Sequence, residues 1–353
     1  NAGDTVIIND NGEKIGEVVV AEDGTWEFTP ETGLTEGDHG ISVIIQDPAG
    51  NQSEPSDEWV VTVDTSAPTA PVIGSVFDDI GTKTGELVSG DSTDDQKPTL
   101  SGTAEQNATV VIYDNGNEIG RVTADANGNW AFTPQTELAE GEYSLTARAL
   151  DAAGNLSEPS EVFELTVDIT APEQPTNDGE GTGISEIIDD HGTIQGPIEQ
   201  GGVTDDTTPT LKGNGNPGDT IIINDNGTKI GEVEVGEDGT WEFTPETDLG
   251  EGDHGISVII QDPAGNQSEP SDEWVITVDT QAPEAPAIGS VLDDVGAKTG
   301  ELTTGDVTDD QQPAFSGTAE AGATVVIYDN GVEIDRVIAE NGTWTFTPKQ
   351  PLA

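Results

Sequence analysis

Pairs of neighbouring aspartates recur along this chain at a fixed spacing, and their side chains could do metal chemistry. Each copy has two Asp-Asp pairs, and the second pair begins 16 residues after the first. A glycine follows each first pair at the same distance, at Gly81, Gly192 and Gly296. Four carboxylates in one loop repel one another unless a cation lies between them. The copies are Asp78, Asp79, Asp94 and Asp95; Asp189, Asp190, Asp205 and Asp206; and Asp293, Asp294, Asp309 and Asp310.

The ligand chemistry of these loops favours calcium. Ca²⁺ takes six to eight oxygen ligands and accepts flexible loops, backbone carbonyls and water. The sequence has no cysteine and three histidines, which argues against zinc and copper. Mg²⁺ is an alternative, although it usually takes fewer protein ligands. The alternative without metal is that Asp and Gly are ordinary turn residues of solvated loops. Because both spacings recur in three copies, we expect Ca²⁺ as the cofactor.

A second candidate cation site lies where one repeat of the chain joins the next. In a seven-stranded sandwich the loop between the last two strands lies at the end where the chain enters. A linker aspartate should therefore face the Asp-x-Ala-Gly-Asn motif of the following repeat. An ion shared there would restrict bending between repeats, and the equally weighted alternative is that the Asp of Asp-x-Ala-Gly-Asn makes an Asx turn. The residues concerned are Asp64 with Asp151 and Asn155, and Asp168 with Asp262 and Asn266.

Internal repetition organises the whole chain. Residues Gly3–Asp64 recur as Gly218–Asp279 with seven differences, and Pro68–Asp95 resembles Pro283–Asp310. The order is therefore A, B, A, B. We predict four repeats: A1 (1–64), B1 (65–168), A2 (169–279) and B2 (280–353). Both types carry Trp-x-Phe-Thr-Pro, and A1, B1 and A2 also carry Asp-x-Ala-Gly-Asn-x-Ser and Val-Asp-x-x-Ala-Pro.

Alternation of apolar and polar residues predicts seven strands in repeat B1. Trp130 and Phe132 fall on one face, as do Trp26 and Phe28, and we expect both pairs in the core. We therefore predict an all-β fold of tandem seven-stranded immunoglobulin-like β-sandwiches in a linear array. The predicted strands are Val72–Phe77, Pro98–Gly102, Thr109–Tyr113, Glu118–Thr123, Trp130–Thr133, Tyr143–Leu150 and Val162–Val167.

The four repeats are not equally complete. Asn1 aligns with Asn216, so repeat A1 lacks the first strands, and repeat B2 lacks the last ones. We expect only B1 and A2 to form whole sandwiches. The spacing of Leu138, Gly141 and Tyr143 looks like a tyrosine corner. The A repeats place His39 and His254 at the tyrosine position, and the resemblance to that corner is expected to fail there.

Charge and composition limit the classes of partner that the chain can bind. The 353 residues include 70 acidic and 10 basic ones, giving a formal net charge of −60. Nucleic acid is excluded because phosphate binding needs basic patches, and anionic membrane surfaces are excluded by the same sign. No apolar run approaches the roughly 20 residues that span a bilayer, so we expect no direct membrane insertion. Without cysteine, no disulfide can stabilise the chain, and cations are the partners that this charge favours.

The combined motifs resemble bacterial immunoglobulin-like repeats over essentially the whole chain. Residues Pro68–Asp168 carry Asp-Asp-x-Gly, Thr-Asp-Asp-x-x-Pro, Asn-Gly-x-Trp-x-Phe-Thr-Pro, Asp-x-Ala-Gly-Asn-x-Ser and Val-Asp-x-x-Ala-Pro. The pattern is most similar to the giant non-fimbrial adhesins of Gram-negative bacteria, of the SiiE and biofilm-associated type. That resemblance implies type I secretion, a place outside the cell or on the bacterial surface, calcium-dependent rigidity, and adhesion to host cells or within a biofilm. It also implies that loop and junction aspartates bind calcium.

Three functions follow from these patterns. The preferred one is a structural stalk segment whose partners are calcium and neighbouring repeats of the same chain. The alternative is a glycan- or protein-binding module whose loops contact a host molecule. An enzyme is the least favoured, because no Ser-His-Asp order and no nucleophile elbow are present and the paired aspartates lie in loops without an aromatic sugar cleft.

Overall fold

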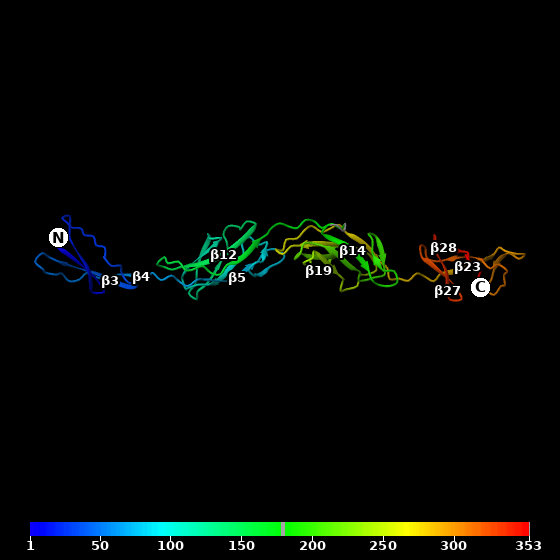
Figure 1. Cartoon of the computed structure of the whole chain (residues 1–353), viewed down its shortest axis with the longest axis horizontal. Helices are drawn as coiled ribbons and strands as arrows, with labels where there is room; N and C mark the ends of the chain where they lie inside the picture. Colours follow the sequence, from blue (N-terminus) through cyan, green and yellow to red (C-terminus); the bar gives the residue numbers. More distant parts are fainter. Residues whose placement is uncertain (178–180, 353) are drawn as a thin grey trace. The chain divides into compact units, whose positions relative to one another are not determined.

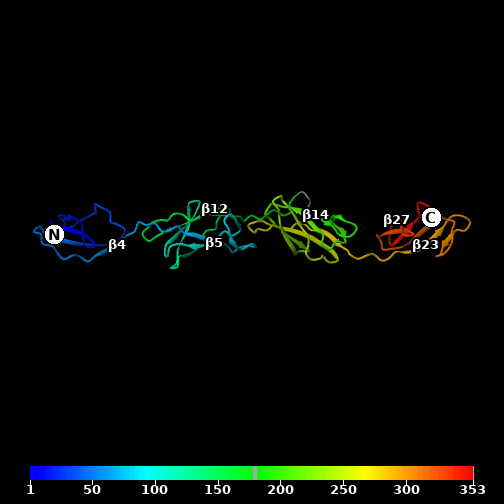
Figure 2. The ribbon, with the colours of Figure 1, turned by 60° about the horizontal axis from the view of Figure 1, so that its bottom comes forward.

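The computed structural model of the chain describes residues 1–177 and 181–352, and every regular element in this part is a β-strand. Figures 1 and 2 show these strands gathered into separate sheets. The all-β immunoglobulin-like prediction is therefore confirmed. No helix long and apolar enough to cross a membrane is found in the described residues.

Repeat B1 is a sandwich of two sheets. One sheet has the order β10-β9-β12-β13-β7 and the other β11-β8-β5-β6. All seven predicted strands are present, with ends that differ by one or two residues. The strands are β5 (Val72–Asp78), β6 (Gly85–Leu87), β7 (Ser92–Thr93), β8 (Thr99–Thr103), β9 (Thr109–Asp114), β10 (Asn117–Thr123), β11 (Asn129–Phe132), β12 (Gly141–Leu150) and β13 (Phe163–Val167).

Two short strands were not predicted, and both lie between the aspartate pairs. Strand β6 pairs antiparallel with β5, and β7 pairs parallel with β13 in the opposite sheet. The chain thus crosses from one sheet to the other between Asp78 and Asp94. Two- and three-residue strands are too short to give an alternation signal, so sequence alone could not reveal them. The crossing fixes both ends of the acidic loop.

Repeat A2 has the same arrangement. Its sheets have the orders β16-β22-β21-β18-β19 and β15-β14-β17-β20. Strand β16 pairs parallel with β22, as β7 does with β13. The strands are β14 (Gly183–Asp189), β15 (Gly196–Pro197), β16 (Gly202–Thr204), β17 (Thr210–Asn214), β18 (Thr220–Asp225), β19 (Thr228–Glu234), β20 (Thr240–Phe243), β21 (Gly252–Gln261) and β22 (Trp274–Val278).

Repeats A1 and B2 each contain part of this arrangement. A1 has one sheet of order β2-β1-β3-β4, and B2 has β24-β23-β25-β28 and the pair β26-β27. Their strands are β1 (Thr5–Asp10), β2 (Glu13–Val19), β3 (Gly37–Gln46), β4 (Trp59–Val63), β23 (Ala287–Asp293), β24 (Gly300–Leu302), β25 (Ala314–Thr318), β26 (Thr324–Asp329), β27 (Val332–Ile338) and β28 (Thr343–Phe346).

The aromatic core prediction is confirmed for Trp130 and Phe132 and is wrong for Trp26, whereas Phe28 is half-buried against the apolar cluster of A1. Trp130, Trp241 and Trp344 are 4–5% exposed, whereas Trp26 is 45% exposed and lies outside any strand. In A2, β20 carries Trp241 and pairs with β17. Residues 1–64 contain no strand equivalent to β17, and among the described residues no second sheet covers Trp26.

A glycine lies beneath each buried tryptophan and sets how closely the ring approaches the sheet. A Cβ on Gly102 would lie 1.9 Å from the Val72 carbonyl oxygen and 2.7 Å from Cζ2 of Trp130. Gly213 and Gly317 have the same relation to Trp241 and Trp344. Any side chain at these positions would push the indole out of the core, which fixes the sheet spacing around it.

Each Asp-Asn-Gly sequence of the chain forms a hairpin turn between two strands. Strand β9 ends at Asp114 and β10 begins at Asn117. Asn115 and Gly116 both have positive φ, 47° and 80°, as a type I′ turn requires. The same turn joins β1 to β2, β18 to β19 and β26 to β27, so Asn11, Asn226 and Asn330 also have positive φ.

Candidate metal sites in the acidic loops and at the repeat junctions

The first aspartate of each loop is buried at the end of a strand. Asp78 ends β5 and is 1% exposed. Its Oδ1 accepts a hydrogen bond from the Ile80 N–H at 2.9 Å, and its Oδ2 accepts one from the Thr93 hydroxyl at 2.5 Å. Both oxygens therefore already have a protein donor. The same pair of bonds recurs for Asp189 with His191 and Thr204, and for Asp293 with Val295 and Thr308.

The last aspartate of each loop is also buried and is tied to the same threonine. The Asp95 N–H donates to Thr93 Oγ1 at 3.1 Å, and Asp95 Oδ1 accepts from the Lys97 N–H at 2.7 Å. The threonine hydroxyl thus joins both ends of the loop. Asp206 and Asp310 repeat this arrangement through Thr204 with Thr208 and through Thr308 with Gln312.

The spacing of the loop glycine, which is the same in all three copies, has a steric reason. Gly81 has a φ of +76°, and a Cβ there would lie 2.0 Å from Asp94 Oδ2. Gly192 and Gly296 stand in the same relation to Asp205 and Asp309, at 2.3 and 2.2 Å. The glycine therefore leaves room for the carboxylate that begins the second pair, and the backbone turn needs the left-handed region that glycine readily adopts.

Two carboxylate oxygens of repeat B1 are buried without a hydrogen-bond partner among the described residues. They are Asp94 Oδ1 and Asp95 Oδ2. Burial raises the pKa of Asp94, and the negative charges of Asp78 and Asp262 raise it further. Burial is also the main cause of the raised pKa of Asp95, and the backbone N–H groups of Lys97 and Asp79 offset part of that rise. Desolvated, unpaired acceptors of this kind are costly unless a cation or a donor meets them, and carboxylate oxygens are the ligand type that hard cations take.

The remaining aspartates of the acidic loops are more exposed to solvent. Asp79, Asp190, Asp294, Asp205 and Asp309 are exposed, and Asp94 is half-buried. In A2 the Asp190 N–H donates to Asp206 Oδ2 at 3.2 Å, and Asp294 makes a 3.4 Å bond to Asp310 in B2. In the part of the chain that the structure describes, no three His, Asp or Glu side chains form a ready-made metal-binding group. The carboxylates gather in the loop and point largely to protein donors.

The predicted junction residues do lie together. Nδ2 of Asn155 donates to the backbone carbonyl of Asp64 at 3.0 Å and to Asp151 Oδ2 at 2.8 Å. Nδ2 of Asn266 makes the same two bonds, to the Asp168 carbonyl and to Asp262 Oδ2, both at 2.9 Å. The linker contributes its carbonyl oxygen, and this contact ties the loop motif to the incoming chain.

The linker carboxylates themselves form Asx turns. Asp64 Oδ1 accepts from the Ser66 N–H and Asp168 Oδ1 from the Thr170 N–H, each at 3.0 Å. Asp151 Oδ1 in turn accepts from the backbone of Asn155 at 2.8 Å. The hydrogen bond from the Asn155 side chain is the main cause of the lowered pKa of Asp151. Local backbone bonds thus hold the motif aspartate Asp151, as the turn alternative expects, and the linker carboxylates Asp64 and Asp168 make turns as well.

The acidic loop of B1 also hydrogen-bonds to the motif loop of A2. The Thr82 hydroxyl donates to the Gly265 carbonyl and the Lys83 ammonium to the Pro263 carbonyl, both at 2.7 Å. Gln261 Nε2 donates to Thr82 Oγ1 at 2.6 Å. These bonds bring Asp262 near enough for its charge to raise the pKa of Asp94.

Sequence reasoning missed the threonines that organise these loops. Thr93, Thr204 and Thr308 each lie 15 residues after the first aspartate and directly before the second pair. The signal was present as Thr-Asp-Asp in all three copies. What the sequence did not show is that the hydroxyl faces inward between two buried carboxylates.

Paired sheets, cross-sheet loops and repeated motifs define a tandem immunoglobulin-like protein. The chain belongs to the bacterial Ig-like domain family, whose model matches residues 1–65, 71–169, 184–280 and 286–353. A stretch of 128 residues is 32% identical to exoglucanase B of Cellulomonas fimi, covering 34% of this chain and 10% of that protein. The chain thus spans about a tenth of this curated relative.

Solved structures similar to the chain include other tandem modules. Fibronectin(III)-like modules of CbhA from Clostridium thermocellum are 19% identical, with a TM-score of 0.33, covering 58% of this chain and 94% of theirs. A tetra-tandem repeat from the extending region of a large adhesion protein is 19% identical, with a TM-score of 0.30, covering 99% and 84%. The family assignment rests on the repeated sequence match.

Proposed function

We propose that this chain is a stalk segment of a large bacterial surface or secreted adhesin, of the biofilm-associated type, stiffened by calcium in its acidic loops and at its repeat junctions. The observation that carries the proposal is the pair of unpartnered buried oxygens, Asp94 Oδ1 and Asp95 Oδ2. They lie in the loop whose Thr82 and Lys83 bond to the following repeat. An ion held there would act on the loop and the junction together.

Asp94 and Asp95 are the first-choice ligands in B1, with Asp79 and Asp262 beside them. Asp78 has both oxygens engaged by protein donors, so its role is to hold the loop in place. Calcium supplies positive charge that offsets the burial of Asp94 and Asp95. Because an ion that binds only the folded chain stabilises it by mass action, concentrations of 100 times Kd add about 2.7 kcal/mol per site.

The formal net charge of −60 fits a role outside the cell. In a compartment poor in calcium, repulsion among the carboxylates opposes folding and favours a chain that can be exported. Where calcium is abundant, binding favours the folded repeats and straightens the stalk. The proposed role of the segment is spacing, without catalysis, and its partners are calcium and neighbouring repeats.

Calorimetric calcium titration of the full chain tests the proposal, together with small-angle scattering in calcium and in EDTA. We expect heat of binding, a higher melting temperature and a stiffer particle in calcium. The double substitution Asp94→Asn with Asp95→Asn should remove part of the heat, whereas Asp125→Asn in an exposed hairpin should not. Absence of binding heat, with equal melting in chelator and calcium, would disprove it. Binding to a glycan array would instead favour the ligand-binding alternative.

A further inference from the structure

A buried histidine stands in the A repeats where the B repeat has its tyrosine corner. In B1 the Tyr143 hydroxyl donates to the Ala139 carbonyl, four residues earlier, at 2.8 Å. In A1 the ring nitrogen Nε2 of His39 bonds at 2.7 Å to the Thr35 carbonyl, also four residues earlier. The expectation that the corner fails in the A repeats is therefore wrong for A1, because an imidazole makes the same bond.

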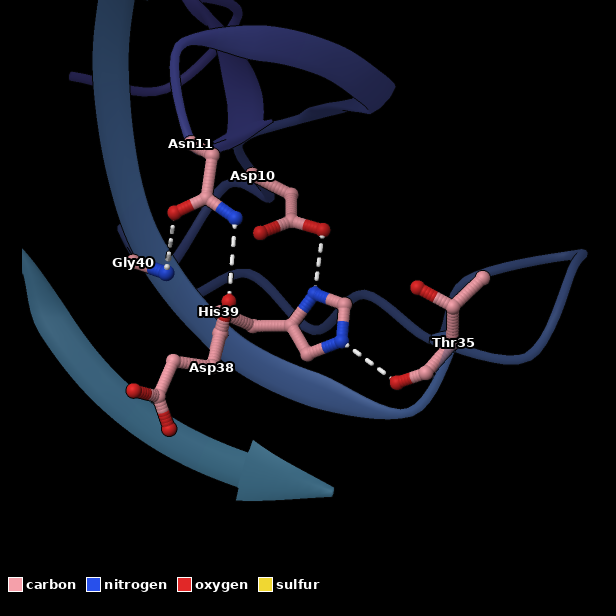
Figure 3. A network of polar contacts seen from close by, with 6 residues as sticks. All are labelled: Asp10, Asn11, Thr35, Asp38, His39 and Gly40. Atoms are coloured by element: carbon pink, nitrogen blue, oxygen red, sulfur yellow. Dashed lines mark hydrogen bonds and ion pairs between the residues drawn. The ribbon is translucent and has the colours of Figure 1, made fainter. Parts of the chain in front are cut away.

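Figure 3 shows that this imidazole faces a second acceptor. Nδ1 of His39 lies 2.5 Å from Asp10 Oδ2, at the end of β1. Asp10 Oδ1 is buried with no partner among the described residues. A neutral imidazole carries one N–H and would leave its other nitrogen facing an acceptor, whereas the imidazolium donates from both. The geometry around His39 thus matches the protonated ring.

The A2 copy keeps the carboxylate partner. Nδ1 of His254 lies 2.8 Å from Asp225 Oδ2, and His254 is 8% exposed. In both copies the following backbone N–H, of Gly40 or Gly255, donates to the hairpin asparagine, Asn11 or Asn226. This hairpin contact holds the aspartate-bearing turn against the histidine strand.

We infer that these histidines are protonated in the folded chain and that their hydrogen bonds stabilise the A repeats. As the pH rises above neutrality the A repeats should therefore lose stability, whereas the B repeats should not. The charged groups that act on His39 in A1 are acidic: Asp10 from β1, Asp38 beside His39 on β3, and Glu58, whose carboxylate lies against Gly40. The cation of the neighbouring strand β2, Lys14, bonds to Glu17 of its own strand. In A2 the corresponding groups are Asp225, Asp253 and Glu273. All of them favour the cationic ring.

The sign of the dependence follows from linkage. The Thr35 carbonyl and the Asp10 carboxylate raise the pKa of His39 above its usual value. The stabilisation is complete below the unfolded pKa of about 6.5 and is lost as the pH rises through the folded value. Tyr143 carries no charge in this range, so the corner of B1 does not respond. General relief of carboxylate repulsion in acid acts on both repeat types and cancels in their comparison.

The first test is an NMR titration of the imidazoles in the full chain, with His191→Gln to assign the third ring. The result expected is that the His39 and His254 rings carry protons on both nitrogens at pH 7 and titrate above the pKa of a free histidine. Neutral rings at pH 7, or titration at or below the free value, would overturn the inference without requiring any core variant to fold.

The second test is hydrogen exchange of the full chain at pH 6 and pH 8.5, corrected for intrinsic rates, comparing β21 of A2 with β12 of B1. Protection of β21 should fall relative to β12 by about tenfold for each unit of pKa elevation. The reciprocal substitutions His254→Tyr and Tyr143→His should move the pH response from A2 to B1, where Asp114 already lies on the equivalent hairpin. An unchanged ratio in the unmodified chain would contradict the inference.

Discussion

Repeats A1 and A2 have almost the same sequence but bury it differently. Gly3–Asp64 and Gly218–Asp279 differ at seven positions, yet Trp26 is 45% exposed and Trp241 4%. Trp59 is 79% exposed, whereas its counterpart Trp274 is half-buried. A2 has the strands β14 and β17 that build the second sheet, and residues 1–64 have no equivalents. Burial in this fold is therefore conferred by distant strands and not by the local sequence.

The largest expected effect separates the two tryptophans. Trp241→Ala should destabilise A2 by about 3–5 kcal/mol, because it empties a packed core position. Trp26→Ala should cost much less, since that ring is half solvated. Urea unfolding followed by hydrogen exchange, resolved by repeat, measures both. Equal losses in A1 and A2 would show that A1 also buries its tryptophan in solution.

Calcium should increase the difference in stability between A1 and the repeats B1 and A2, because A1 carries no Asp-Asp pair. Added calcium at 100 times Kd should raise protection in B1 and A2 by the equivalent of about 2.7 kcal/mol per site. Strands β1 and β3 should change little. The measurement is exchange in calcium against exchange in EDTA. A uniform gain across all repeats would point to general charge screening instead of loop sites.

The threonine bridge of the acidic loop should matter next. Thr204→Val leaves Asp189 Oδ2 without its donor and should destabilise A2 by about 1–3 kcal/mol. Thr228→Val on the exposed hairpin strand β19 is the matched control and should be nearly neutral. Thermal unfolding of each variant compares them. If the two substitutions cost the same, the bridge does not stabilise the loop.

The smallest effect is expected at Asp47 of A1, because its hydrogen bonds are local and do not depend on a second sheet. Bonds from Asn51 and from the backbone lower the pKa of Asp47, and these donors lie within four residues. The stabilisation from Asp47 is present above the unfolded pKa of about 3.9 and is lost as the pH falls through the lower folded value. Asn51→Ala should raise the pKa of Asp47 in a carboxyl NMR titration. An Asp47 pKa at the free value in the unmodified chain would contradict the assignment.

The sequence predicted most of the strands but little of how the acidic loop is held. Long alternating segments such as Tyr143–Leu150 carry enough period-two signal to be recognised. Asn-Gly is an equally clear turn signal, because few residues readily adopt positive φ. The short strands β6 and β7 gave no such signal. Consequently the grouping of the aspartates was predicted, whereas the inward turn of Asp78 and Asp95 toward Thr93 was not.

What the sequence by itself determined is local: repeat order, strand periodicity, turn chemistry and the spacing of the aspartates. These depend on residues a few positions apart, so one repeat's sequence contains them in full. The tertiary structure decided which of these residues are buried and what they contact. Trp26 and Trp241 share a motif but not an environment, and only the folded chain places the His39 ring against Asp10. Contacts between distant strands set solvation, and solvation sets the charge and strength of each polar group.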